Sequence, residues 1–244
     1  KNNIINSGPI TTFNTYSVVS ENRLVILPPN ISKKEAVLYG CALPTGAGMI
    51  FNQTNLSKNK SIAIIGIGGV GLIALISSNI FKCKNIIAID TNEKKLQLAK
   101  KYGATHLINP NKTNIYAAIN KITDFKGVDY SIDCAGKVKS IETGFEIINK
   151  KSGKCIFCSH PIYGEKIKLD PFHLICGKQI KGSWGGNVKP DKDIPKFAKI
   201  FKSSKISFKK LIAKKYTLDQ INDALKDLER ARVIRPLIVI DEKL

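Results

Sequence analysis

Apolar runs and amphipathic segments alternate along the middle of this chain. Continuous apolar runs predict buried strands, and the longer periodic segments between them predict helices. The predicted strands are 62–65, 85–89, 106–108, 128–133 and 155–159. The predicted helices are 70–81, 93–102, 113–122 and 140–149. Unbroken apolar strands separated by helices indicate a parallel sheet covered on both faces, so the pattern predicts a doubly wound α/β fold.

The two ends of the chain carry weaker patterns. A short apolar strand is expected at 23–27, followed by Pro28-Pro29, and a helix at 32–39 with Ser32 as N-cap and Glu35 three residues later. Further helices are expected at 45–51, 174–181, 194–203 and 221–229, and a final strand at 237–240.

Residues 62–81 carry no charge and are long enough to cross a bilayer. Four glycines, however, interrupt this stretch where the predicted strand turns into a helix, and charged periodic segments follow directly. We therefore expect a buried strand and helix, and no membrane partner.

The formal net charge of +20 allows nucleic-acid binding as one interpretation. The lysines are scattered, and no stacking or recognition motif accompanies them. A lysine-rich surface is the favoured interpretation, so no nucleic-acid partner is expected.

Six cysteines in 244 residues do not form the dense framework of a small secreted domain. A reduced, cytoplasmic setting is therefore expected. Cys155 and Cys158 have C-x-x-C spacing, but they lie on a predicted strand, where positions three apart face opposite sides. We interpret this pair as core.

The most specific motif is Gly66-Ile-Gly68-Gly69-Val70-Gly71, which fits G-x-G-x-x-G. It follows a predicted strand and opens a predicted helix, as a dinucleotide-binding turn requires. Gly66 permits the tight turn, Gly68 lets a pyrophosphate approach the backbone, and Gly71 allows close packing of helix and strand. The helix N-terminus offers N–H groups to the phosphates.

The next predicted strand ends at Asp90, nineteen residues after Gly71. A carboxylate there can accept hydrogen bonds from both ribose hydroxyls and would repel a 2′-phosphate, which favours NAD over NADP. Lys94 and Lys95 weaken this preference, because either could meet a phosphate.

These residues and their flanks resemble the zinc-dependent medium-chain dehydrogenase/reductase (alcohol dehydrogenase) superfamily, in its C-terminal portion with the coenzyme domain. The resemblance covers nearly the whole chain. The motifs that carry it are Gly40-Cys41 to Gly46, Glu93 to Thr105, Gly127 to Asp129, Asp133 to Gly136, Lys181-Gly182, Gly185-Gly186 and Arg235-Pro236.

The resemblance implies roles for several residues. Cys41 would be one of three protein ligands of a catalytic zinc, although a small buried cysteine is the alternative. Thr45 would line the nicotinamide and Lys95 would lie near the adenosine ribose. Arg235 would reach the pyrophosphate, where its forked guanidinium suits phosphate oxygens. The only tryptophan, Trp184, would lie near the nicotinamide end.

The chain departs from the family pattern at the metal. The family's other zinc ligands and its proton-relay hydroxyl lie in an N-terminal, barrel-like (GroES-like) catalytic domain that is largely missing here, so the catalytic residues are expected there. None of the three histidines falls at a ligand position, and we interpret them as core or surface residues. The chain begins at Lys1, as a processed, trimmed or partial sequence would.

The expected domains are a remnant of the catalytic domain at 1–42, an NAD-binding Rossmann domain at 43–182, and a return to the catalytic domain at 183–244. The implied function is zinc-assisted hydride transfer between an alcohol or polyol and NAD in the complete protein, in a homodimer or homotetramer. Two alternatives stay open: a zinc-independent quinone- or enoyl-type reductase, and a non-catalytic NAD-binding module.

Overall fold

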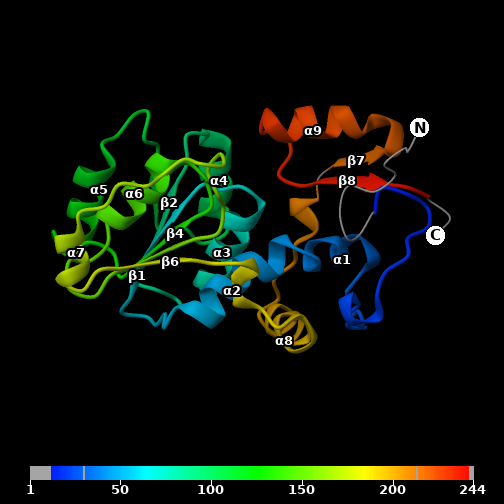
Figure 1. Cartoon of the computed structure of the whole chain (residues 1–244), viewed down its shortest axis with the longest axis horizontal. Helices are drawn as coiled ribbons and strands as arrows, with labels where there is room; N and C mark the ends of the chain where they lie inside the picture. Colours follow the sequence, from blue (N-terminus) through cyan, green and yellow to red (C-terminus); the bar gives the residue numbers. More distant parts are fainter. Residues whose placement is uncertain (1–11, 30, 213, 242–244) are drawn as a thin grey trace. The chain divides into compact units, whose positions relative to one another are not determined.

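The computed structural model describes residues 12–29, 31–212 and 214–241, and these form two compact units. The larger unit spans residues 38–197 (Figure 1). The smaller unit combines the described parts of 1–37 and 198–244. The expected catalytic-domain remnant at 1–42 therefore begins in residues outside the described part of the chain.

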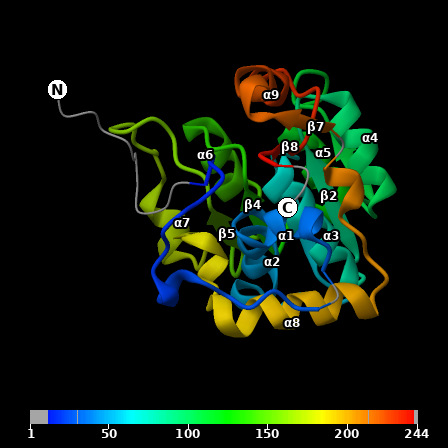
Figure 2. The same cartoon turned by 90° about the vertical axis from the view of Figure 1, so that its right-hand side faces the viewer.

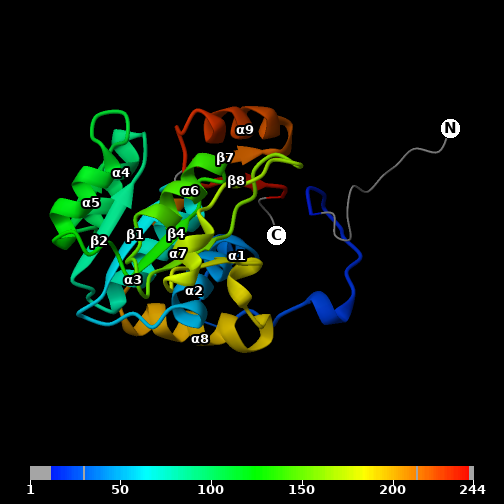
Figure 3. The same ribbon diagram turned by 60° about the vertical axis from the view of Figure 1, so that its left-hand side comes forward.

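A six-stranded parallel sheet forms the centre of the larger unit. Its order is β3-β2-β1-β4-β5-β6, which is the strand order of a Rossmann fold. Figure 3 shows β2, β1 and β4 side by side. The strands are β1 (Ser61–Ile65), β2 (Asn85–Ile89), β3 (His106–Ile108), β4 (Tyr130–Asp133), β5 (Lys154–Phe157) and β6 (Gln179–Gly182). The predicted doubly wound α/β fold is confirmed.

Helices cover both faces of this sheet. Figure 1 shows α5 and α6 on one side of the strands and α3 and α4 on the other. The helices of this unit are α2 (Ala42–Gln53), α3 (Gly69–Ile80), α4 (Glu93–Lys101), α5 (Ile115–Thr123), α6 (Val138–Glu146) and the short α7 (Pro171–Ile175). Because both faces are covered, every residue of β1 and β2 is buried, which explains their unbroken apolar sequence.

Residues 62–81 fold as β1, a turn and α3, as expected. Among the described residues, no helix combines the length and apolarity that a membrane span needs.

The expected helix at 174–181 is wrong. Helix α7 ends at Ile175, and Gln179–Gly182 form strand β6 instead. Gly177 has a φ of +110°, and a Cβ there would lie 2.2 Å from the carbonyl oxygen of Lys151. The chain therefore turns at this glycine and pairs with β5, with Lys154 opposite Gln179.

The expected strand at 23–27 is also wrong. Glu21–Arg23 form a 3-10 helix, and residues 24–28 have no regular structure. The neighbouring prediction is confirmed: α1 spans Lys33–Tyr39, and Ser32 and Glu35 form its capping pair.

The smaller unit contains two parallel strands and a helix. Figure 2 shows α9 (Ile221–Glu229) beside β7 (Lys214–Thr217) and β8 (Pro236–Val239). Asp227 of α9 accepts hydrogen bonds from the Tyr216 hydroxyl at 2.7 Å and the Lys214 ammonium at 2.9 Å. These contacts from Lys214 and Tyr216 hold the pKa of Asp227 well below its usual range. Helix α8 spans Pro190–Ser203.

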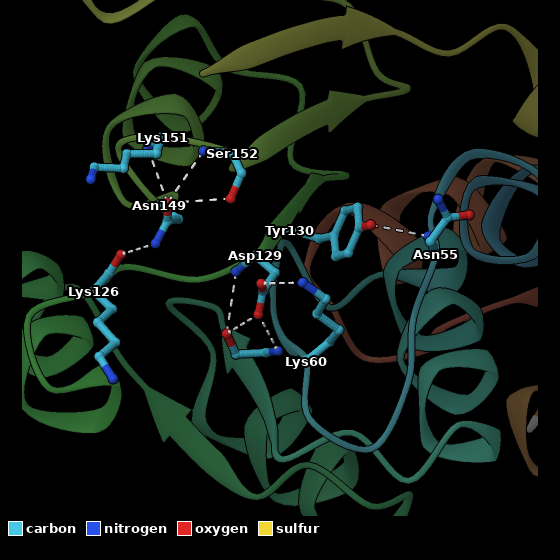
Figure 4. Close-up of polar contacts among 9 residues, drawn as sticks. Asn55, Lys60, Lys126, Asp129, Tyr130, Asn149, Lys151 and Ser152 are labelled. Carbon is cyan, nitrogen blue, oxygen red and sulfur yellow. Dashed lines mark hydrogen bonds and ion pairs between the residues drawn. The ribbon is translucent and has the colours of Figure 1, made fainter. Parts of the chain in front are cut away.

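One carboxylate joins the amino ends of β1 and β4 in the larger unit. Asp129 accepts hydrogen bonds from the Ser61 backbone N–H at 2.8 Å, the Ser61 hydroxyl at 2.9 Å and the Lys60 ammonium at 2.9 Å (Figure 4). Partial burial raises the pKa of Asp129, but the hydrogen bonds from Ser61 and Lys60 outweigh burial and lower it overall.

We expect Asp129→Asn to reduce the free energy of unfolding by about 1–2 kcal/mol at neutral pH, because it removes a charge-assisted acceptor for three donors. Because the pKa of Asp129 is lower in the folded protein than in the unfolded chain, its stabilisation is present above the unfolded pKa and is lost as pH falls through the folded pKa. Urea unfolding between neutral and acid pH measures both effects.

The matched control is Asp124→Asn, at an exposed position with a left-handed backbone that asparagine also tolerates. Equal losses of stability in both variants would contradict the role of Asp129.

Candidate functional site

The glycine-rich turn lies at the carboxyl end of β1. In this strand order, β1 continues to β2 on one side and borders β4 on the other, so the turn lies where the winding of the sheet reverses. Ligands of open α/β sheets bind in the crevice at this switch point. The structure therefore places the predicted turn where a ligand site is expected.

Three backbone segments approach each other closely at this turn. Gly66 has a φ of +86°, and a Cβ there would lie 2.7 Å from the Ala135 nitrogen, just after β4. A Cβ on Gly71 would lie 2.0 Å from the carbonyl oxygen of Gly66. Neither position has room for a side chain, because strand, turn and helix are packed backbone to backbone.

Gly68 differs from these two glycines. A Cβ there would meet no protein atom within 4 Å, and its backbone is extended. Packing within the chain therefore does not explain the glycine. Gly68 is the N-cap of α3, and the first N–H groups of a helix, here from Gly69 and Val70 onward, have no intrahelical acceptor. Open space beside such donors suits an anionic group.

Asp90 connects the turn to the end of β2. One carboxylate oxygen accepts from the Ile67 N–H at 2.7 Å, and the other accepts from the Asn92 N–H at 2.8 Å. Each oxygen has two lone pairs, so both keep capacity for a further donor. The half-buried carboxylate is thus oriented by backbone contacts and can still bind hydroxyl groups.

Lys95 lies in the first turn of α4, close in sequence to Asp90. The Asn92 side chain caps this helix by accepting from the N–H groups of Lys94 and Lys95. The Lys95 side chain is half-buried, whereas Lys94 is exposed.

A second segment, at the start of α2, meets this turn. A Cβ on Gly46 would lie 2.6 Å from the carbonyl oxygen of Val70, in the first turn of α3. A Cβ on Gly186 would lie 2.7 Å from the carbonyl oxygen of Thr45. The Thr45 hydroxyl donates to the Cys41 carbonyl at 2.8 Å. The structure therefore brings Cys41, Thr45 and the glycine turn into one region.

Cys41 is the N-cap of α2, and its side chain is exposed, which does not fit the alternative of a small buried residue. Across the described residues, no group of three or more His, Cys, Asp or Glu side chains could hold a metal ion. One thiol does not make a zinc site, so the described part of the chain does not fit a zinc ion by itself.

Two further residues were predicted to line the cofactor site. Arg235 belongs to the smaller unit, where it is half-buried directly before β8. Trp184 is 95% exposed and precedes the 3-10 helix η2 (Gly185–Asn187).

The sequence analysis assigned no role to Asp133, the last residue of β4. Its side chain is fully buried, and one carboxylate oxygen has no hydrogen-bond partner among the described residues. The other oxygen accepts from the Gly136 N–H at 3.2 Å. Burial raises the pKa of Asp133. An acidic residue at the end of a buried strand, beside the glycine turn, was the signal that could have identified it.

The zinc-binding dehydrogenase family matches residues 69–203, more than half of the chain. An S-(hydroxymethyl)glutathione dehydrogenase from Haemophilus influenzae is 31% identical over 233 residues, and a protein of the same name from Escherichia coli is also 31% identical. Each match covers 93% of this chain. The chain spans 61% and 62% of the length of these two relatives.

Solved structures show the same fold. The crystal structure of benzyl alcohol dehydrogenase from Acinetobacter calcoaceticus matches with a TM-score of 0.87 at 32% identity, over 93% of this chain and 62% of that one. An alcohol dehydrogenase zinc-binding domain protein from Burkholderia ambifaria matches with a TM-score of 0.86 at 29% identity, over 93% and 60%.

The different surroundings of Gly68 and Gly71 generate a matched pair of variants. We expect Gly71→Ala to lower the Tm by about 5 °C or more, because forcing one methyl group into this packed contact lowers the free energy of unfolding by about 2 kcal/mol. Gly68→Ala should change the free energy of unfolding by less than about 0.5 kcal/mol. Thermal unfolding followed by circular dichroism tests both, and a large loss in Gly68→Ala would contradict the open space at this position.

Proposed function

This chain belongs to the zinc-binding dehydrogenase family, and from that membership we propose that the complete protein transfers a hydride between an alcohol or polyol and NAD. The observation that carries this proposal is the glycine turn at the switch point, with open space at Gly68 and the Asp90 carboxylate beside it. This chain spans less than two thirds of its relatives, so the proposal concerns the protein that contains it.

Each part of the turn has a separate task in holding NAD. The N–H groups that begin α3, over Gly69, Val70 and Gly71, would bind the pyrophosphate in the space left open at Gly68. Asp90 would accept hydrogen bonds from the two adenosine ribose hydroxyls with its remaining lone pairs. Lys95 would lie beside the same ribose, and Arg235 would contact the pyrophosphate. When bound, NAD supplies the acceptor or donor of the hydride.

The start of α2 would form the nicotinamide end. Thr45 would line the ring there. Its backbone contacts Gly186, and its helix packs on the first turn of α3 through Gly46. The proposal gives these residues a positioning task, since hydride transfer requires the two reacting carbons to be held in close contact.

Zinc would require residues beyond the described ones. Cys41 would supply one thiolate ligand in the complete protein, and its exposed position at the N-cap of α2 leaves the sulfur accessible. The remaining ligands and the proton-relay group would come from the catalytic domain. Residues 1–42 and 183–244 would belong to that domain, and residues 43–182 would be the NAD-binding domain.

The relatives are named after S-(hydroxymethyl)glutathione and benzyl alcohol, and both compounds contain a primary hydroxyl group. We therefore propose a small alcohol or the corresponding aldehyde as substrate. A cytoplasmic location is consistent with six free thiols, and a homodimer or homotetramer is the proposed assembly.

We expect Asp90→Asn to weaken NADH binding by about ten-fold, because it replaces a charged acceptor of the ribose hydroxyls. NADPH binding should be unchanged or tighter, since the repulsion between Asp90 and a 2′-phosphate is removed. Titrations of both cofactors by NADH and NADPH fluorescence measure this. Equal losses for the two cofactors would argue that Asp90 supports only the turn.

We expect Cys41→Ser in the full-length protein to reduce NAD-dependent oxidation of primary alcohols by more than about 100-fold, since loss of an outer-shell partner of a metal already costs about 10–100-fold. NADH affinity should stay within about two-fold, because Cys41 does not form the glycine turn. The matched control is Cys176→Ser, which also changes an exposed cysteine. Enone reduction with NADPH that resists chelators would instead support the zinc-independent reductase.

A further inference from the structure

Two cysteines that hydride transfer does not use lie side by side at the carboxyl edge of the sheet. The Sγ atoms of Cys134 and Cys158 are 3.8 Å apart. Each follows directly after a strand, and the preceding residues, Asp133 and Phe157, are partners in the parallel pairing of β4 and β5. The register of the sheet therefore places the two thiols on the same face and next to each other.

This arrangement corrects the interpretation of Cys158 as core. Cys155 is fully buried, as expected, but Cys158 lies beyond the end of β5 and is partly exposed. Cys134 is also partly exposed. Both residues are therefore partly open to solvent, although they border the core.

The environment of Cys158 favours its reactive form. The side-chain hydrogen bond between Cys158 and Cys134, helped by the Ser159 hydroxyl, lowers the pKa of Cys158, while burial and Asp133 oppose this. The hydrogen bond to Cys158 and burial raise the pKa of Cys134. Because the thiolate is the nucleophile, Cys158 is the group that reacts first.

We propose that Cys134 and Cys158 are a dithiol that hydroperoxides oxidise reversibly to an intrachain disulfide, and that this disulfide weakens NADH binding at the adjacent glycine turn. The Cys158 sulfur attacks the hydroperoxide, the O–O bond breaks, and an alcohol or water leaves with the thiol proton. The Cys134 sulfur then displaces the resulting S–OH oxygen as water. Two electrons leave the dithiol, and the hydroperoxide is reduced by two electrons.

The required movement is small. A disulfide has an S–S length of about 2.05 Å, so the sulfurs must approach by roughly 1.8 Å. Neighbouring parallel strands are about 4.8 Å apart, which lies within the Cα separations that disulfides span.

Contacts of Cys134 connect this movement to the turn. A Cβ on Gly71 would lie 3.4 Å from the Cys134 Cβ, and a Cβ on Gly66 would lie 2.9 Å from the Cys134 carbonyl carbon. The Cys134 N–H also donates to the Ile65 carbonyl at 2.8 Å. A shift of Cys134 therefore presses on Gly66 and Gly71, the two positions of the turn that have no free space. The disulfide itself does not depend on the proposed function, whereas its effect on NADH rests on it.

The test uses the full-length protein, treated with hydrogen peroxide, alkylated and digested with trypsin. The two cysteines fall in separate peptides, residues 127–137 and 155–166. We expect a linked pair of these peptides in the wild type and in Cys176→Ser, reversed by dithiothreitol, and absent from Cys158→Ser and Cys158→Ala. NADH titration should show affinity reduced at least about five-fold in the oxidised wild type and unchanged in the Cys158 variants.

Full alkylation of Cys134 and Cys158 after peroxide, separate sulfinic acids, or a link that persists in Cys158→Ser would overturn the dithiol. A linked pair with unchanged NADH affinity would overturn its effect on the turn. If the reduced protein binds no NADH while the linked pair forms, the proposed function fails and the dithiol stands.

Discussion

The close backbone packing at the switch point is the constraint on which this site depends. Gly71 lies against the Gly66 carbonyl, and Gly66 lies against the chain just after β4. No side chain fits at either contact, so the start of α3 is held directly over the ends of two neighbouring strands. This places the first N–H groups of the helix beside the open space at Gly68. A local steric requirement thereby fixes the direction in which the helix presents its positive end.

The same packing connects parts of the chain that are distant in sequence. Gly46 brings α2 onto the first turn of α3, and Gly186 brings η2 onto Thr45. Glycines therefore form the close contacts on both sides of the turn. Gly66 and Gly71 lie where β1 and β4 end, and Gly46 and Gly186 lie against the starts of α3 and α2. Asp90 adds an electrostatic element, because its two oxygens each hold a backbone N–H and keep capacity for another donor. The proposed cofactor site is thus built mainly from backbone, with few charged side chains.

Sequence patterns succeeded where a feature depends on neighbours along the chain and failed where it depends on a partner strand. Strands β1 and β2 were predicted from their unbroken apolar runs, which burial on both faces of the sheet requires. Gln179–Gly182 carry no such run, because β6 lies at the edge of the sheet and is largely exposed. Leu24 and Ile26 suggest a strand because both are apolar. They are largely exposed, however, and residues 24–28 form no strand. Pairing with another strand is not encoded in a short apolar run.

The sequence by itself determined the order of strands and helices from β1 to β5, the glycine turn and the acidic residue after β2, because each is a local pattern with a fixed spacing. Only the tertiary structure decided which distant residues meet. It placed Thr45 and Gly186 together and showed that Gly68 faces open space while Gly71 does not. It also separated Cys158 from Cys155 and set it beside Cys134, since the register between β4 and β5, and not C-x-x-C spacing, controls which thiols are neighbours.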